Sequence, residues 1–233
     1  MSRGGPLWPP ALLKESMNSF KTVIYDCDGV IFDSFEANLA FYNKIMEMLG
    51  KPPLDRSDGT LMRVLHTFAS QEVLRHIFPD ETIWRAAMGC ISAVNYRELV
   101  PLMRMEKGFR DTIETLSGSV DLAICTNRAT SMDAVMEAFD LGRYFGIVMT
   151  ALKVTNPKPH PEPLLKVLDH YRIAPCEALF VGDSDVDRQA AEAAGVPFVA
   201  YKTNLPGLAH IDHHQDILPL VFKCKESHSA AFP

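Results

Sequence analysis

The sequence predicts an α/β protein in which an all-helical domain is inserted after the first strand of a parallel sheet. From residue 105 onward, apolar runs of strand length alternate with amphipathic helical stretches. Between 35 and 104, apolar residues recur at helical spacing and no strand signal of comparable strength appears. These two patterns assign 20–34 and 105–222 to an α/β core domain and 35–104 to a helical domain.

The first predicted strand, 23–25, is a short run of β-branched and aromatic residues that suits a buried strand. Asp26, Cys27, Asp28 and Gly29 follow it. Because side chains alternate along a strand, both carboxylates should point to one side and Cys27 into the core. Two such carboxylates repel each other, and a cation would remove that repulsion. Taken alone, the pattern is more typical of a turn in which aspartates bond the local backbone.

The inserted segment predicts three helical stretches. The first begins at Asp33, a capping residue with Glu36 three positions later, and ends at Gly50. Two further amphipathic stretches cover 61–77 and 83–99. Together they predict a small helical bundle.

The later part of the chain predicts strands at 120–125, 146–150, 178–181 and 198–201, alternating with helices at 109–116, 132–139, 163–171 and 187–194. Such alternation predicts a Rossmann-like parallel sheet with helices on both faces. Ligands of these sheets bind beyond the carboxyl ends of the strands. Polar residues of a binding site are therefore expected at those ends.

Three further polar signals follow apolar runs. Thr126, with Asn127 after it, ends the strand 120–125 and can offer a hydroxyl and backbone N–H groups to a phosphate. Lys158 lies between prolines, which lack N–H donors and leave its ammonium as the main donor of the loop. The segment 182–187 is an acidic turn that opens a helix. Taken singly, Thr126 fits a helix cap, Lys158 fits a solvated surface lysine and the acidic turn fits a helix start. Their order and spacing along the chain together favour a functional site.

In these motifs, over about 21–204, the chain resembles the haloacid dehalogenase-like (HAD) hydrolase superfamily. It is most similar to the branch with a helical cap that includes phosphoglycolate phosphatases and β-phosphoglucomutase. The resemblance implies a phosphatase that hydrolyses a small phosphorylated metabolite through an aspartyl-phosphate. It implies Asp26 as the nucleophile, and Asp28 as the acid that protonates the leaving oxygen and then the base that activates water.

The resemblance also implies Mg²⁺, held by Asp26, the backbone carbonyl of Asp28 and Asp183. Asp187 would lie just outside the direct ligands of the ion or bind the ion through water. Ser184 would also lie just outside the direct ligands. The transferring phosphoryl group would be bound by Thr126, Asn127 and Lys158.

Asp28 distinguishes the chain from dehalogenases, which need no acid at that place, and from P-type ATPases, which carry threonine there. The motifs do not separate a phosphatase from a phosphomutase of the β-phosphoglucomutase type. A catalytically silent regulatory member is the third alternative, although an acid cluster under charge strain has no use in such a protein. In the cap, the residues that can reach an anionic leaving group are Lys51, Arg56, Arg63 and His66, and each also fits a solvated position.

The composition is that of an ordinary globular protein, with 47% hydrophobic and 22% charged residues among 233. The formal charge of −6 gives no support to nucleic-acid or anionic-membrane partners, which need basic patches. No apolar stretch approaches the roughly 18 residues that a membrane span requires. We expect a monomer or a small homo-oligomer.

Five scattered cysteines without a C-x-x-C pair favour a reducing compartment, so we expect a cytoplasmic protein. We interpret His210, His213 and His214 as surface histidines and not as a metal cluster. The termini 1–19 and 223–233 are expected to be loosely held, with Met17 as the alternative start of the chain.

Overall fold

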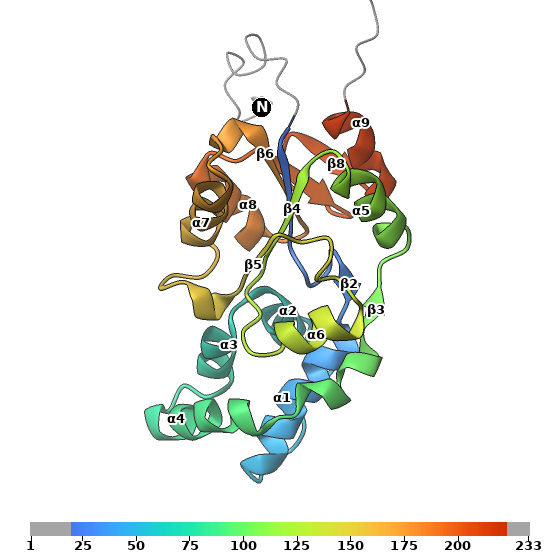
Figure 1. The fold of residues 1–233 in the computed structure, drawn as a ribbon. Helices are drawn as coiled ribbons and strands as arrows, with labels where there is room; N and C mark the ends of the chain where they lie inside the picture. The colour runs from blue at the N-terminus through green and yellow to red at the C-terminus, as the bar shows by residue number, and fades with distance from the viewer. Residues whose placement is uncertain (1–19, 223–233) are drawn as a thin grey trace, which may run out of the picture.

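The computed structural model describes residues 20–222, and the expectations for the two termini lie outside this range. Six parallel strands form the main sheet in the order β5-β4-β1-β6-β7-β8 (Figure 1). The predicted α/β class is therefore confirmed. The strands are β1 (Thr22–Tyr25), β4 (Asp121–Cys125), β5 (Ile147–Met149), β6 (Ala178–Gly182), β7 (Phe198–Tyr201) and β8 (Ala209–Ile211).

The register of the central strands brings their carboxyl ends together. In β1, Tyr25 lies opposite Ile124 of β4 on one side and Val181 of β6 on the other. Because parallel strands in register end at the same edge, the residues that follow β1, β4 and β6 leave the sheet side by side. Residues about 150 positions apart in the chain thereby become neighbours.

Alternation along β1 explains why the sheet is covered on both faces. Val23 and Tyr25 belong to one buried cluster with Phe109, whereas Ile24 belongs to the other with Leu164. In Figure 1 the first face carries α5 and α9, and the second carries α7 and α8. These helices are α5 (Phe109–Ser117), α7 (Glu162–Tyr171), α8 (Asp185–Ala194) and α9 (Leu218–Val221); α6 (Met132–Ala138) follows β4.

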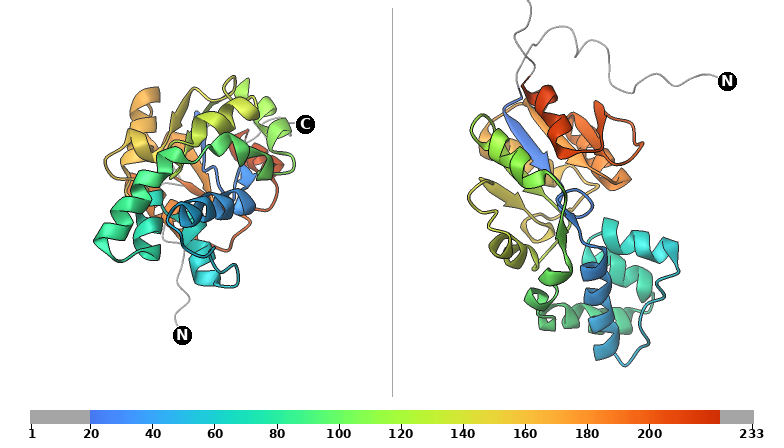
Figure 2. Two further views of the ribbon diagram at one scale, coloured as in Figure 1. Left: turned by 90° about the horizontal axis from the view of Figure 1, so that it is seen from below. Right: turned by 90° about the vertical axis from the view of Figure 1, so that its right-hand side faces the viewer.

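A helical block, 35–103, lies beyond the carboxyl edge of the sheet (Figure 1; Figure 2, right). The stretch predicted at 61–77 is two helices, because Phe68 and Ala69 adopt extended backbone between them. The helix predicted over 83–99 ends at Cys90 and continues as 3-10 turns, broken where the Asn95 side chain caps a new turn. The helices are α1 (Phe35–Met48), α2 (Gly59–Thr67), α3 (Ser70–Ile77) and α4 (Glu81–Cys90); the turns are Ile91–Ala93, Tyr96–Glu98 and Val100–Leu102.

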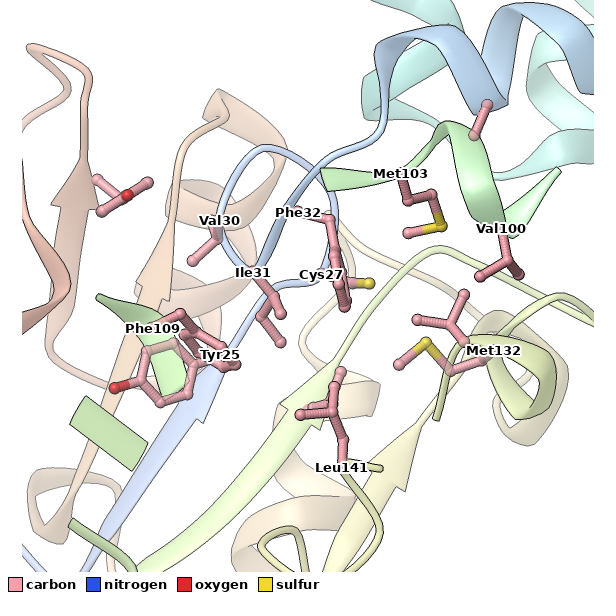
Figure 3. Packing of buried hydrophobic residues seen from close by; sticks show 14 of the residues in the cluster. Tyr25, Cys27, Val30, Ile31, Phe32, Val100, Met103, Phe109, Met132 and Leu141 are labelled. Atoms are coloured by element: carbon pink, nitrogen blue, oxygen red, sulfur yellow. The ribbon is translucent and has the colours of Figure 1, made fainter. Parts of the chain in front are cut away.

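The chain enters and leaves the helical block through a two-stranded antiparallel pair that the sequence did not reveal. It consists of β2 (Phe32–Asp33) and β3 (Arg104–Met105), which at two residues each are too short for a periodic signal. Apolar side chains near this crossing, among them those of Phe32 and Met103, pack together (Figure 3). The predicted start of α1 was wrong by one residue, because Ser34 and not Asp33 occupies the cap position.

The interpretation of His214 as a surface residue was wrong. Its side chain is buried beneath Tyr201, whose ring stacks on it with centroids 4.4 Å apart. Its Nε2 lies 3.0 Å from the carbonyl oxygen of Val30, to which it can donate. His210 and His213 are exposed as expected. Sequence pattern missed this contact because it joins residues 184 positions apart.

None of the helices within 20–222 combines the length and the apolar character that crossing a bilayer requires.

We expect acid to destabilise the wild-type protein by a component that a His214→Gln variant lacks. Burial lowers the pKa of His214 to about 4 in the folded chain, whereas an unperturbed histidine has a pKa of about 6.5. The unfolded chain therefore binds more protons in this window. The stabilisation is complete above about pH 6.5 and is lost as the pH falls toward 4, by up to about 3 kcal/mol. Urea unfolding at pH 7 and pH 4.5 measures it.

The matched control is His213→Gln, which changes an exposed histidine on the same segment and should keep the wild-type pH dependence. Glu106 and Lys202, the charged groups that act on His214, are present in all three proteins and cancel in the comparison. Identical pH dependence of the wild type and His214→Gln would show that this histidine does not titrate as stated.

Candidate active site

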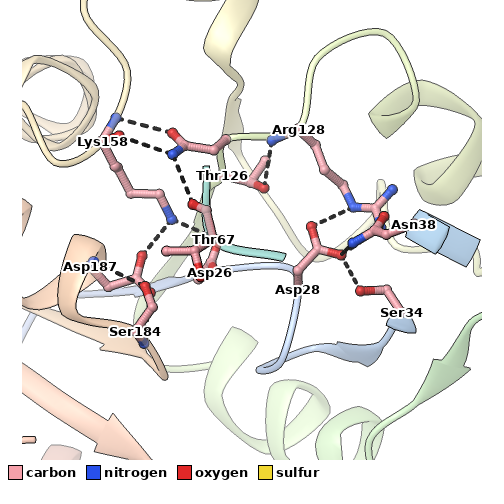
Figure 4. Close-up of polar contacts among 11 residues, drawn as sticks. Asp26, Asp28, Ser34, Asn38, Thr67, Thr126, Arg128, Lys158, Ser184 and Asp187 are labelled. Carbon is pink, nitrogen blue, oxygen red and sulfur yellow. Dashed lines mark hydrogen bonds and ion pairs between the residues drawn. The ribbon is translucent and has the colours of Figure 1, made fainter. Parts of the chain in front are cut away.

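The centre of the site is a buried ammonium shared by two carboxylates. Nζ of Lys158 lies 2.8 Å from Oδ1 of Asp26 and 2.6 Å from Oδ1 of Asp187 (Figure 4). Only 2% of the Lys158 side chain is exposed, so neither ion pair is screened by solvent. The three residues come from the end of β1, the loop before α7 and the first turn of α8.

A third carboxylate joins this cluster. Asp26, Asp183 and Asp187 offer oxygen atoms that all lie within 4.8 Å of one another. Burial raises the pKa of Asp183 to about 8, and the charges of Asp187 and Asp26 add to the effect. Burial also raises the pKa of Asp26 to about 7, against the opposing charge of Lys158. When all three carboxylates are ionised, the single ammonium of Lys158 leaves two negative charges of the cluster unbalanced, and the raised pKa values reflect this repulsion.

The donors of this cluster fit Mg²⁺, which prefers carboxylate and carbonyl oxygens together with water. No side chain in the described range 20–222 donates a hydrogen bond to the carboxylate of Asp183, and the backbone carbonyl of Asp28 likewise accepts none there. A divalent cation would neutralise the two charges that Lys158 leaves unbalanced. The carboxylate of Asp28 is not part of the cluster.

Gly29 lets the loop after β1 pass directly against Asp183. Its φ is +76°, and a Cβ at this position would lie 2.1 Å from Oδ2 of Asp183. The residue thus meets two requirements at once, a left-handed backbone and the absence of a side chain. The carboxylate of Asp183 is held beside the loop that carries Asp28.

Ser184 and Asp187 form a reciprocal cap at the start of α8. The Ser184 hydroxyl donates to Oδ2 of Asp187, and the backbone N–H of Asp187 donates to the hydroxyl oxygen at 3.3 Å. Because Oδ1 of Asp187 accepts from Lys158, both oxygens are engaged. Asp187 therefore contacts Lys158 directly, and Ser184 fixes its rotamer.

Thr126 and Asn127 line the same cavity as Asp26 and Lys158. The hydroxyl oxygen of Thr126 accepts from the N–H of Arg128 at 3.1 Å, and its own N–H donates to Met149 of β5. The amide of Asn127 bonds both the N–H and the carbonyl of Lys158, each at 3.0 Å. Its side chain thus clamps the Lys158 loop, whereas the resemblance implied contact with a phosphoryl group.

The carboxylate of Asp28 is bound by Arg128, a residue for which the sequence predicted no role. Nε and Nη2 of Arg128 lie 2.7 and 2.5 Å from the two carboxylate oxygens, and the Ser34 hydroxyl also donates to Asp28 (Figure 4). Burial alone would raise the pKa of Asp28, but the charge and hydrogen bonds of Arg128 outweigh it and lower the pKa. The position of Arg128, two residues after Thr126 at a strand end, was the signal available.

The cavity between the sheet edge and the helical block is lined from both sides. Asp26, Asp28 and Lys158 line it from the sheet, and Asn38, His66 and Tyr96 line it from the helices. Of the four residues expected to reach a leaving group, only His66 is among the lining residues of this cavity; Lys51, Arg56 and Arg63 are not. Arg56 instead pairs with Glu36 on the surface.

Three comparisons bear on this arrangement. A model of the haloacid dehalogenase-like hydrolase family matches residues 23–201. The phosphoglycolate phosphatase of Escherichia coli K12 is 46% identical over 91 residues, which are 38% of this chain and 36% of that enzyme, so the match spans about a third of the relative. Salmonella choleraesuis has a phosphoglycolate phosphatase that is 45% identical over a match of the same length.

Solved structures extend the likeness to most of the chain. A HAD-superfamily hydrolase of Geobacter sulfurreducens is 61% identical, with a TM-score of 0.72 over 89% of this chain and 99% of that one. The CbbY protein of Rhodobacter sphaeroides, crystallised with xylulose-1,5-bisphosphate, is 18% identical, with a TM-score of 0.71 over 85% of this chain and 96% of that one. At that identity the second likeness concerns the fold alone.

We expect Gly29→Ala to weaken divalent-cation binding by displacing Asp183. A Cβ at Gly29 would overlap Oδ2 of Asp183, whereas at Gly50, with φ +63°, it would meet nothing within 4 Å. Gly50→Ala is therefore the matched control, because both substitutions carry a left-handed strain of about 1–2 kcal/mol. The rise in melting temperature on adding Mg²⁺ should disappear in Gly29→Ala and persist in Gly50→Ala. A rise equal to that of wild type in Gly29→Ala would contradict the packing described.

Proposed function

Because the chain belongs to the haloacid dehalogenase-like hydrolase family, we propose that it hydrolyses a small phosphate monoester, with Mg²⁺, through an aspartyl-phosphate. The observation that supports this most directly is the cluster of Asp26, Asp183, Asp187 and Lys158 at the edge of a covered cavity. The relatives named phosphoglycolate phosphatase make 2-phosphoglycolate the first substrate to test.

Asp26 is the proposed nucleophile. In the range 20–222 its Oδ1 accepts from Lys158, while no side chain donates to Oδ2. Attack by Oδ2 on phosphorus forms the aspartyl-phosphate as the bond to the leaving oxygen breaks. Lys158 is proposed to bind the transferring phosphoryl group and to offset its charge, which is supported by its position in the same cavity as Thr126.

Asp28 is the proposed acid and base. In the first step it gives a proton to the leaving oxygen, and in the second it takes one from the water that attacks the aspartyl-phosphate, which releases orthophosphate. The pairing with Arg128 favours the carboxylate, which is the form that the second step requires. The negative charge of an arriving phosphate acts in the opposite sense and favours the protonated form for the first step.

The proposed metal site comprises Asp26, Asp183 and the backbone carbonyl of Asp28. When bound, Mg²⁺ supplies positive charge that reduces repulsion between these carboxylates and the phosphate. We further propose that 35–104 acts as a cap domain over the cavity, moving about the β2–β3 pair and excluding water during transfer.

We propose a cytoplasmic monomer or small homo-oligomer that acts on a phosphorylated metabolite. Cys27, Cys90, Cys125 and Cys176, the cysteines within 20–222, are all free thiols, as a reducing compartment permits.

The proposed activity predicts release of orthophosphate from p-nitrophenyl phosphate that requires Mg²⁺ and Asp26. In Asp26→Asn the carboxylate nucleophile is lost, and we expect kcat to fall by at least about a thousandfold. Phosphate release with and without EDTA measures both requirements, and the melting temperature shows that the variant folds. With a sugar phosphate supplied as substrate in place of p-nitrophenyl phosphate, formation of its isomer without release of orthophosphate would indicate a mutase. Equal inactivity of both proteins while Mg²⁺ still binds would indicate a silent member.

A second prediction separates the role of Asp28 from that of Asp26. Asp28→Ala should slow hydrolysis of 2-phosphoglycolate by about 10²–10⁴-fold, because an alkoxide leaving group needs a proton. Hydrolysis of p-nitrophenyl phosphate should slow less at the first step, since nitrophenolate leaves without one. Single-turnover bursts of p-nitrophenol isolate that step. Equal losses on both substrates would argue that Asp28 is not the acid.

A further inference from the structure

Arg128 uses all its hydrogen-bond donors within the protein. A guanidinium carries five N–H groups, and five acceptor contacts surround it at 2.5–3.2 Å. The acceptors are the two carboxylate oxygens of Asp28, the side-chain oxygen of Asn38, the hydroxyl of Tyr96 and the hydroxyl of Ser131. The side chain is 5% exposed. With every donor occupied, it has none left for a substrate in this arrangement.

The partners of Arg128 come from both parts of the fold. Asp28 and Ser131 belong to the core, next to β1 and α6, whereas Asn38 lies on α1 and Tyr96 in the 3-10 turn 96–98. Asn38 also donates to Oδ1 of Asp28 at 3.3 Å. The complete set of bonds around Asp28 and Arg128 therefore exists only while the helical block lies against the sheet edge.

We propose that Arg128 is a positioning residue that couples closure of the helical block to the orientation of the Asp28 carboxylate. The inference rests on the proposed function, in which Asp28 acts as acid and base. The planar fork of Arg128 fixes both oxygens of the carboxylate, which a single ammonium cannot do. When the block moves away, Arg128 loses the oxygens of Asn38 and Tyr96, and Asp28 loses the amide of Asn38.

An exposed ion pair between the same two parts of the fold provides a control. Arg97, next to Tyr96, pairs at 2.5 Å with Glu137 of α6, and the two side chains are 64% and 63% exposed. Solvent screens such a pair, so it contributes little to holding the block. Arg97→Ala removes a contact between block and core without touching Asp28.

The experiment compares Arg128→Lys, Tyr96→Phe and Arg97→Ala in the full chain with 2-phosphoglycolate as substrate. Arg128→Lys keeps the charge and loses the fork, and kcat should fall about 100-fold, because misplacement by about 1 Å has effects of that size. KM should change less than about threefold, since Arg128 does not bind the substrate. Tyr96→Phe should lose less kcat, and Arg97→Ala should stay within about twofold of wild type.

A double variant identifies the route of the effect. If Arg128 acts through Asp28, then adding Arg128→Lys to the Asp28→Ala variant should lower kcat by less than a further factor of about two, measured with p-nitrophenyl phosphate. A full additional loss, a rise in KM alone, or an equal loss in Arg97→Ala would overturn the proposal.

Hydrogen exchange tests, without any assay of activity, whether Arg128 holds the helical block against the core. Amides of 35–48 should exchange faster in Arg128→Lys and in Tyr96→Phe than in Arg97→Ala. Should Arg128→Lys fail to fold, Tyr96→Phe decides alone, since it removes one oxygen and keeps the ring. An inactive wild-type protein would refute the proposed function, and exchange would then still decide whether Arg128 ties the block to the core. Equal exchange in all variants would contradict the inference that Arg128 holds the helical block against the core.

Discussion

The buried contact of Lys158 with Asp26 and Asp187 is the interaction on which the other features of the site depend. Removing an ammonium from water is unfavourable unless anions surround it, and removing carboxylates from water is unfavourable unless cations do. The parallel register of β1 and β6 meets both needs, because it places Asp26 and the turn before α8 side by side. The loop of Lys158 is held over them by Asn127, whose amide bonds both backbone groups of the lysine.

A second buried cation divides the site into two charge centres. Lys158 faces the acids of the sheet edge, and Arg128 faces Asp28. The separation allows Asp26 and Asp28, only two residues apart, to have pKa values shifted in opposite directions, upward for Asp26 and downward for Asp28. Two carboxylates in one motif thereby acquire environments suited to different tasks. A chain with a net charge of −6 achieves this with local positive charge alone.

The parts of the fold that local pattern determines could be predicted from the sequence. The apolar run before Asp26 and the alternation after residue 105 were sufficient for the parallel sheet, and strand ends indicated where polar residues gather. Contacts that depend on how the helices pack could not be predicted from the sequence pattern. Ser34, at the cap position of α1, also donates from its hydroxyl to Asp28, and Arg128 reaches Asp28 across 100 residues of sequence. The strands β2 and β3 have two residues each, too few to show a period.

The narrow β2–β3 crossing has a consequence for how such a protein can diversify. The chain leaves the sheet at Phe32–Asp33 and returns at Arg104–Met105 as a bonded neighbour, so the two points are separated by about one strand spacing of roughly 5 Å. The segment between these two points is therefore an insertion whose two ends are neighbours, like a single long loop that leaves the sheet and returns to it. An exchange of that loop for another of different shape need not disturb strand order or the acids at the sheet edge. The helical block can thus be replaced as a module, while the cluster of acids at the sheet edge is inherited unchanged.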